Sequence, residues 1–250
     1  MHRDPDSPRF GSVVIVGGGC YGSFYAGQLA QARKRGKVVY REVLIVDRDP
    51  ACRVAGELAR LPDQRLVVSD WSAFFDRWLD PAERAPDDLI VPSPLMPHLM
   101  YDWLLRRARA RWPNRQVATR ALARPLGTPY DTLAPDGTRY VSFADWRCPT
   151  HCIEPAICPV TRGPRTWEMA EALREAVRRS RRHEPIRGPV LFRCTHQVHG
   201  VGAFSAAEVL RADQEVGTVG EEAESVDVLV ATVSGCHGAV NLLHLGPGTG

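Results

Sequence analysis

Residues 13–22 read VVIVGGGCYG, an apolar run that passes directly into a glycine-rich turn. Val13–Val16 are consecutive β-branched residues, which predict a buried strand. Gly17, Gly19 and Gly22 have the spacing G-x-G-x-x-G and precede a segment with helical periodicity. The first glycine allows a tight turn, the second leaves the backbone accessible, and the third lets the helix pack closely on the strand. These residues predict a strand–turn–helix unit with an open turn.

The first 111 residues repeat this alternation of strand and helix four times. The expected strands cover residues 12–16, 41–46, 66–68 and 88–91, and the expected helices cover 21–35, 49–61, about 70–78 and 98–111. Such alternation is typical of a mostly parallel sheet with helices on both faces. We therefore expect an α/β fold of the doubly wound type.

The alternation is interrupted in the middle of the chain and then returns. A β-hairpin around the Asp136-Gly137 turn and a loop rich in cysteine and proline are expected at about 125–165. The later expected elements are a helix over 166–181, a strand over 189–192, a helix over 203–211, a strand over 226–233 and a helix over 238–243. This pattern favours one domain over 13–245 with an insertion, a flexible N-terminus over 1–12 and a flexible tail over 246–250.

An acidic residue stands where the second expected strand ends. Asp47 lies 25 residues after Gly22, somewhat more than the usual 20 or so. With the glycine spacing, it makes the first 95 residues or so resemble NAD(P)- and FAD-binding Rossmann-type proteins. The resemblance implies a Rossmann-like fold, phosphates bound at the helix N-terminus and a ribose held by Asp47. An acid here implies NAD in preference to NADP, although Arg48 would partly offset that preference.

The glycine turn would place Cys20 and Tyr21 beside a bound nucleotide. The same pattern also resembles class I methyltransferases, which bind S-adenosylmethionine with a glycine-rich loop and an acid after the second strand. Residues 67–70 and 88–91 would then correspond to their later motifs. Those enzymes usually carry an acid before the glycines, where this chain has Val14-Ile15-Val16. The residues therefore favour NAD but leave S-adenosylmethionine open.

The most unusual passage is CPTHCIEPAICP, residues 148–159. Cys148, Cys152 and Cys158 have the spacing C-x3-C-x5-C among prolines that stiffen the loop. Thiolates are natural ligands of zinc and of iron–sulfur clusters. The spacing differs from that of ferredoxins, zinc ribbons and radical enzymes. We expect a metal site here without being able to choose between zinc and a cluster.

Further thiol and imidazole groups follow the later strands. A fourth ligand is expected from Cys194, His196 or His199, or from Cys236. Cys236 and His237 are also candidate catalytic residues, because a helix beginning at Gly238 would lower the pKa of the thiol. In a single open α/β sheet, ligands bind at the carboxyl ends of the strands, so these groups and the glycine turn would share one location.

Charge and composition exclude some classes of protein. The net charge is only +3, and 30 of the 32 basic residues are arginine, since Lys34 and Lys37 are the only lysines. The arginine-dense stretches 106–124 and 174–187 carry no aromatic pattern for stacking bases, so no nucleic-acid partner is expected. No apolar run reaches about 18 residues, and residues 1–10 lack the apolar region of a signal peptide. We expect a cytoplasmic protein that does not bind membranes.

The seven cysteines are an odd number in a chain expected to be cytoplasmic, so a disulfide framework is not predicted. The overall expectation is an NAD(H)-binding oxidoreductase that acts on a small molecule or with a redox partner protein. No Tyr-x-x-x-Lys pair or other acid–base set is recognisable in the sequence. A non-catalytic nucleotide sensor or electron-transfer protein therefore remains an alternative, as does a methyltransferase with a structural zinc loop.

Overall fold

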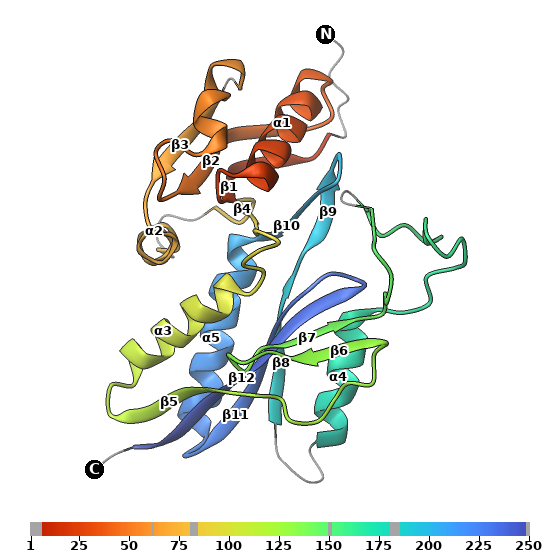
Figure 1. Ribbon diagram of the computed structural model, residues 1–250. Helices are drawn as coiled ribbons and strands as arrows, with labels where there is room; N and C mark the ends of the chain where they lie inside the picture. Colours follow the sequence, from red (N-terminus) through yellow and green to blue (C-terminus); the bar gives the residue numbers. More distant parts are fainter. Residues whose placement is uncertain (1–6, 62, 81–84, 150–151, 181–185, 249–250) are drawn as a thin grey trace. The chain divides into compact units, whose positions relative to one another are not determined.

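The structure is a computed structural model that describes residues 7–61, 63–80, 85–149, 152–180 and 186–248. The chain divides into two compact units, where the sequence favoured one domain. Unit 1 comprises residues 1–97 and 194–210, and unit 2 comprises residues 98–193 and 211–250. The described residues form a mixed α/β fold with two six-stranded sheets, one in each unit, in place of a single continuous sheet (Figure 1).

Unit 1 contains a sheet with the strand order β3-β2-β1-β4-β10-β9. Its strands are β1 (Arg9–Val16), β2 (Val39–Asp47), β3 (Gln64–Val68), β4 (Leu89–Val91), β9 (Thr195–Val198) and β10 (Val201–Ser205). The four N-terminal strands are parallel, whereas β10 pairs antiparallel to β4 and to β9. The sheet is therefore completed by two strands that come from much later in the chain.

Both faces of this sheet are buried at its centre, because every residue from Ser12 to Val16 is buried. One face packs against helix α1 (Cys20–Lys34) through Ala26, Leu29 and Ala32. Helix α2 (Trp71–Trp78) contacts β2 and begins at Asp70, whose side chain accepts the amide hydrogens of Ser72 and Ala73. The expected cap at Ser69 or Asp70 is thus confirmed at Asp70.

Unit 2 contains a sheet in the order β6-β7-β12-β11-β8, with β5 also paired to β12. Its strands are β5 (Arg115–Arg120), β6 (Tyr130–Leu133), β7 (Arg139–Ser142), β8 (Ile186–Arg193), β11 (Val226–Val233) and β12 (His237–Gly248). All pairs are antiparallel except the parallel pair β11–β8. The hairpin β6–β7 confirms the turn expected at Asp136-Gly137, where Gly137 has a φ of 87°.

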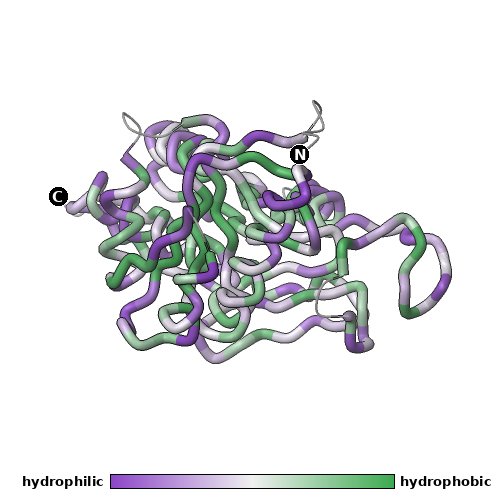
Figure 2. Tube along the Cα trace, turned by 90° about the horizontal axis from the view of Figure 1, so that it is seen from above, coloured by the Kyte–Doolittle hydropathy of each residue, from purple (hydrophilic) through white to green (hydrophobic). Residues whose placement is uncertain are grey.

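Alternate residues of β11 face different helices, as expected for a strand. Leu229, Ala231 and Val233 belong to the core cluster that includes α4 (Met169–Ser180). Thr232 instead forms a hydrogen bond with His98, which precedes α3 (Leu99–Arg111). The third helix of this region, α5 (Ala206–Glu222), is joined to α3 by ion pairs from Arg107 and Arg111 to Asp213. Figure 2 colours the hydrophobic residues of the chain green, and the apolar residues of these cores are among them.

Several expected elements differ from those observed. The helix expected over 238–243 is the central strand β12, whose apolar run is compatible with either structure on local pattern alone. The helix expected over 49–61 is two short 3-10 helices, η1 (Arg53–Gly56) and η2 (Leu58–Arg60). The helix expected from 203 begins at 206, because the preceding residues pair as β10, and β5 and β9 were not expected.

Parts of the two ends that were expected to be flexible belong to strands. Residues 9–12 belong to β1, and residues 246–248 belong to β12, where Gly248 pairs with Arg115. Pairing with neighbouring strands gives these segments the order that their composition alone does not predict. Residues 1–6 and 249–250 lie outside the described residues.

Candidate functional sites

The glycine turn between β1 and α1 shows three different glycine geometries. Gly17 has a φ of 86°, a conformation that side-chain-bearing residues rarely adopt. A Cβ atom at Gly22 would lie 1.8 Å from the carbonyl oxygen of Gly17, so the helix packs directly on the turn. A Cβ atom at Gly19 would meet nothing within 4 Å, so this part of the backbone is open. Gly17 therefore forms the turn, Gly22 allows the close packing of the helix, and Gly19 leaves the backbone exposed.

The N-terminus of α1 opens at this turn without a side-chain cap. Its N-cap is Gly19, and no acidic residue occupies its first turn. Cys20 and Tyr21 are both exposed there. An uncapped N-terminus of a 15-residue helix offers amide hydrogens and the positive end of the helix dipole. This end of α1 is therefore electrostatically suited to an anionic group.

Asp47 ends β2 beside the glycine turn. Its Oδ2 atom accepts a hydrogen bond from the amide of Gly18 at 2.7 Å, and its Oδ1 atom accepts one from the amide of Asp49 at 2.9 Å. These bonds fix the orientation of the carboxylate, and each oxygen keeps a lone pair for a further donor. The adjacent Arg48 is exposed.

Two further residues lie near the turn and were not singled out from the sequence. Arg53 of η1 places Nη1 3.6 Å from Sγ of Cys20, next to the start of α1. Trp71 donates its indole hydrogen to the carbonyl oxygen of Val46 at 2.9 Å, and its Cζ2 atom lies 3.8 Å from the position that a Cβ of Gly17 would take. The sequence signal that could have identified Trp71 was its position directly after the Ser69-Asp70 cap.

The Cys194–His199 segment belongs to unit 1 and forms β9 and the turn to β10. The Nε2 atom of His196 accepts the amide hydrogen of Gly200 at 2.9 Å, and burial lowers the pKa of His196. His199 has a φ of 48°, and its carbonyl oxygen accepts a hydrogen bond from Gln28. The three loop cysteines belong to unit 2, so Cys194, His196 and His199, which were predicted as sources of a fourth ligand, lie in the other unit.

Four cysteines line one small pocket in unit 2. These are Cys148, Cys152 and Cys158 of the loop and Cys236 of the turn between β11 and β12. The pocket has a volume of about 10 Å³, close to the space of one water molecule. Trp146, Pro155, Arg165 and Trp167 are among its other walls. Within the described ranges, no three His, Cys, Asp or Glu side chains are already arranged as ligands of one ion.

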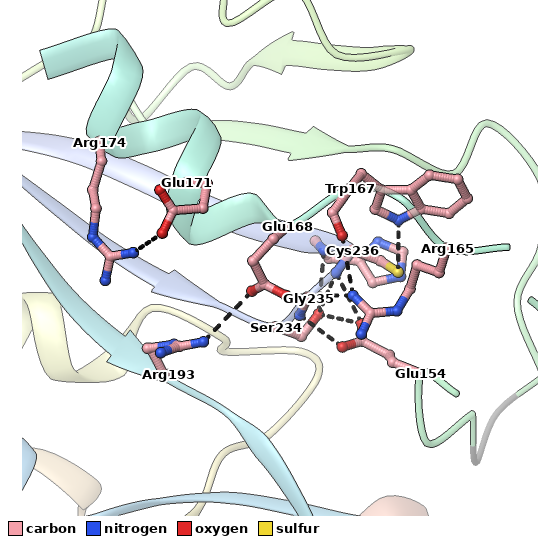
Figure 3. A network of polar contacts seen from close by, with 11 residues as sticks. Glu154, Arg165, Trp167, Glu168, Glu171, Arg174, Arg193, Ser234, Gly235 and Cys236 are labelled. Atoms are coloured by element: carbon pink, nitrogen blue, oxygen red, sulfur yellow. Dashed lines mark hydrogen bonds and ion pairs between the residues drawn. The ribbon is translucent and has the colours of Figure 1, made fainter. Parts of the chain in front are cut away.

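A carboxylate that the sequence analysis did not single out ties the cysteine loop to the β11–β12 turn (Figure 3). Glu154 accepts hydrogen bonds from the hydroxyl of Ser234 at 2.6 Å, from the amide of Gly235 at 2.6 Å and from the amide of Cys236 at 3.0 Å. Glu154 itself has a φ of 51°, a strained value for a residue with a side chain. The sequence signal that could have identified Glu154 was its position between Cys152 and Pro155.

Cys236 precedes a strand, so the helix expected to activate it is absent. The indole hydrogen of Trp167 points to its Sγ atom at 3.2 Å. Burial raises the pKa of the Cys236 thiol to about 11, the opposite of the predicted shift. The helix on which the predicted activation rested is therefore absent, and burial shifts the pKa in the opposite direction.

His237 begins β12 with both ring nitrogens near polar groups. Nδ1 lies 2.9 Å from the hydroxyl oxygen of Ser142, and Nε2 lies 3.9 Å from Sγ of Cys148. Burial lowers the pKa of His237 and raises that of Cys148. In the described structure the thiol beside the His237 ring is thus that of Cys148. The sequence position of His237 next to Cys236 did not suggest this contact.

The fold and these two sites define a mixed α/β protein with a glycine-rich turn in one unit and a cysteine-lined pocket in the other. A family model described as "Uncharacterized protein, C-terminal domain" matches residues 100–246, more than half of the chain. The chain belongs to this family. No curated protein and no solved structure matches the chain. Among the described residues, none of the helices combines the length and apolar character needed to cross a membrane.

Proposed function

We propose that unit 1 is a Rossmann-like domain that binds NAD(H), and that the protein is an oxidoreductase. The observation that carries this proposal is the glycine turn at the carboxyl end of β1, with Asp47 at the end of the neighbouring strand β2. The parallel strands have the order β3-β2-β1-β4, which matches the first four positions of the Rossmann strand order 3-2-1-4-5-6.

The residues around the turn fit the chemistry of a dinucleotide. The open backbone at Gly19 and the uncapped start of α1 suit the pyrophosphate. The carboxylate of Asp47 is held in place and has free lone pairs for the two hydroxyls of a ribose. Arg53 adds a positive charge beside Cys20 at the phosphate end. When bound, the nicotinamide would supply hydride transfer, and the protein would bind and orient it.

S-adenosylmethionine is the rival ligand, since the methyltransferases that bind it use a similar turn and an acid after the second strand. The uncapped N-terminus of α1 favours NAD(H), because S-adenosylmethionine has no phosphate to place there. A non-catalytic sensor would bind the same dinucleotide without turnover. The oxidoreductase would act on a small molecule or with a redox partner protein, and activity assays with the established cofactor distinguish the two.

The first experiment is calorimetric titration of the full chain with NAD⁺, NADH, NADP⁺ and S-adenosylmethionine. We expect NAD(H) to bind more tightly than NADP⁺, because Asp47 would repel a 2′-phosphate. Asp47→Ala should weaken NAD(H) binding about 10- to 100-fold, the value of a charged hydrogen-bonding group. Asp49→Ala, which keeps the backbone amide that contacts Asp47, is the matched control and should bind normally.

A second variant tests the role of the open backbone. Gly19→Val should abolish NAD(H) binding while leaving the fold intact, because a Cβ atom there meets no atom within 4 Å outside the adjacent residues. Circular dichroism checks the fold. Tight binding of S-adenosylmethionine without binding of NAD(H) would overturn the proposal, as would undiminished NAD(H) binding in the Gly19→Val variant.

A further inference from the structure

We propose that Cys148, Cys152, Cys158 and Cys236 together bind one thiophilic divalent ion, Zn²⁺, in unit 2. This site lies outside the nucleotide-binding turn and does not depend on the function proposed for it. The starting observation is that the four side chains line the same pocket, although Cys236 lies far from the other three in sequence. A metal would cross-link the loop to the turn that begins β12.

The distribution of cysteines over the chain supports this assignment. All seven thiols are free, and the remaining three, Cys20, Cys52 and Cys194, belong to unit 1. Every cysteine of unit 2 therefore lines this one pocket. Cysteines placed only for apolar packing have no reason to gather in this way, whereas ligands of one ion must do so.

Hydrogen-bond donors point at the sulfurs in the manner of an outer coordination shell. The amide of Glu154 lies 3.4 Å from Sγ of Cys152, and the indole nitrogen of Trp167 lies 3.2 Å from Sγ of Cys236. Cys158 interacts with the amide and hydroxyl of Thr161, and Cys148 has His237 beside it. Donors of this kind orient thiolate ligands and disperse their negative charge.

The described part of the loop backbone, from residue 152 onward, is already held by hydrogen bonds without the ion. The amide of Cys158 donates to the carbonyl oxygen of Gly163 at 2.9 Å, and the amide of Arg165 donates to that of Ala156 at 2.7 Å. Glu154 fixes the loop to residues 234–236 through three hydrogen bonds. Binding then needs mainly rotation of the thiol side chains toward a common centre, to a metal–sulfur distance of about 2.3 Å.

The size of the pocket favours a single ion over a cluster. Its volume of about 10 Å³ has room for one atom of the size of water. A four-iron cluster with its bridging sulfides would require the loop to move outward. The guanidinium of Arg165 is also part of the wall and offsets part of the charge of four thiolates.

The test is metal analysis of the freshly purified full chain. We expect about one zinc per chain and a colourless solution, and replacement by Co²⁺ should give thiolate charge-transfer absorption. Each of C148S, C152S, C158S and C236S should lower bound zinc severalfold. C194S and C52S are matched controls, since both lie in unit 1, and they should retain zinc fully.

A measurement on the unaltered protein guards against variants that fail to fold. Removal of zinc by a strong chelator should make the segment around residues 147–165 more sensitive to protease, and added zinc should reverse this. The proposal is overturned by wild-type protein without bound metal, by zinc that survives all four replacements, or by loss of zinc in C194S. A brown protein containing iron and acid-labile sulfide would also overturn the assignment of a single ion.

Discussion

The glycine turn and the cysteine pocket are built in opposite ways. The turn comes from six consecutive residues, 17–22, and its shape depends on the absence of side chains. The pocket comes from a loop and from a turn some eighty positions later, and its character depends on four sulfurs and one carboxylate. A local backbone site carries its requirements in a short sequence pattern. A site assembled by tertiary structure carries only half of its pattern in any one segment.

The largest destabilisation is expected when a single methyl group is added in the glycine turn. Gly22→Ala places a Cβ 1.8 Å from the Gly17 carbonyl oxygen, and we expect it to destabilise unit 1 by at least about 3 kcal/mol. Gly27→Ala in the same helix meets nothing within 4 Å and should stabilise by about 0.5–1 kcal/mol. Urea unfolding of the two variants measures the difference. Equal stability of the two would contradict the close packing at Gly22.

At the pocket, the prediction concerns the stability of unit 2 when the Glu154 carboxylate is removed. Glu154→Ala removes the acceptor of the Ser234 hydroxyl and of the Gly235 amide, and the nearer of two acceptors of the Cys236 amide, and should destabilise unit 2 by about 2–3 kcal/mol. Glu171→Ala is the control, because the carboxylate of Glu171 forms an exposed ion pair with Arg174 and should cost under about 0.5 kcal/mol. Chemical denaturation distinguishes them, and a Glu154 effect as small as that of Glu171 would show that the loop does not depend on this anchor.

Acidic pH should distinguish the two units by their stability, because we expect it to lower the free energy of unfolding of unit 2. Burial lowers the pKa of His98 in unit 2 to about 3, while the unfolded residue titrates near 6.5. Between these values the unfolded state holds the extra proton, so stability is complete above pH 6.5 and declines as the pH falls toward 3. From pH 7 to pH 5 the loss should be about 2 kcal/mol.

The control for this acid effect is His98→Gln, which removes the titrating group and should abolish this part of the pH dependence. His98 stacks on Tyr101 and bonds to Thr232, and Asp136 is the charged group that acts on it. Denaturation midpoints at both pH values, followed by hydrogen exchange in each unit, provide the readout. An unchanged midpoint in the unaltered protein at pH 5 would contradict a buried neutral imidazole.

The smallest effect is expected at Ser142, which lies next to His237. Ser142→Ala removes the hydroxyl that accepts the amide hydrogen of Ala144 and lies 2.9 Å from Nδ1 of His237, a loss of about 1 kcal/mol. Ser180→Ala, at the half-buried C-terminal end of α4, removes one hydrogen bond to the carbonyl oxygen of Val177 and should cost less. Urea midpoints of both variants decide, and the reverse ranking would show that Ser142 does not hold the His237 ring.

The contrast also explains how much the sequence could predict. The strands and helix around Gly17–Gly22, the end of β2 at Asp47 and the Asp70 cap follow local rules, and they were predicted at nearly their observed positions. The apolar run of β12 has no local feature that separates strand from helix, and only its pairing with β11, β7 and β5 decides it. The error at β12 led directly to the wrong chemistry predicted for Cys236. The gathering of Cys236 with the loop cysteines was one of several options, because spacing alone does not select a distant ligand.

The return of β10 to the sheet of unit 1 has a consequence for synthesis on the ribosome. Phe204 pairs with Ile90, 114 positions earlier, so the edge of β4 stays unpaired until most of the chain has been made. The nascent N-terminal segment must keep this apolar edge from associating with other chains, and closing so long a connection is entropically slow. A chain that stops before residue 194 would retain the glycine turn but expose β4, and aggregation of such a fragment is the outcome to expect.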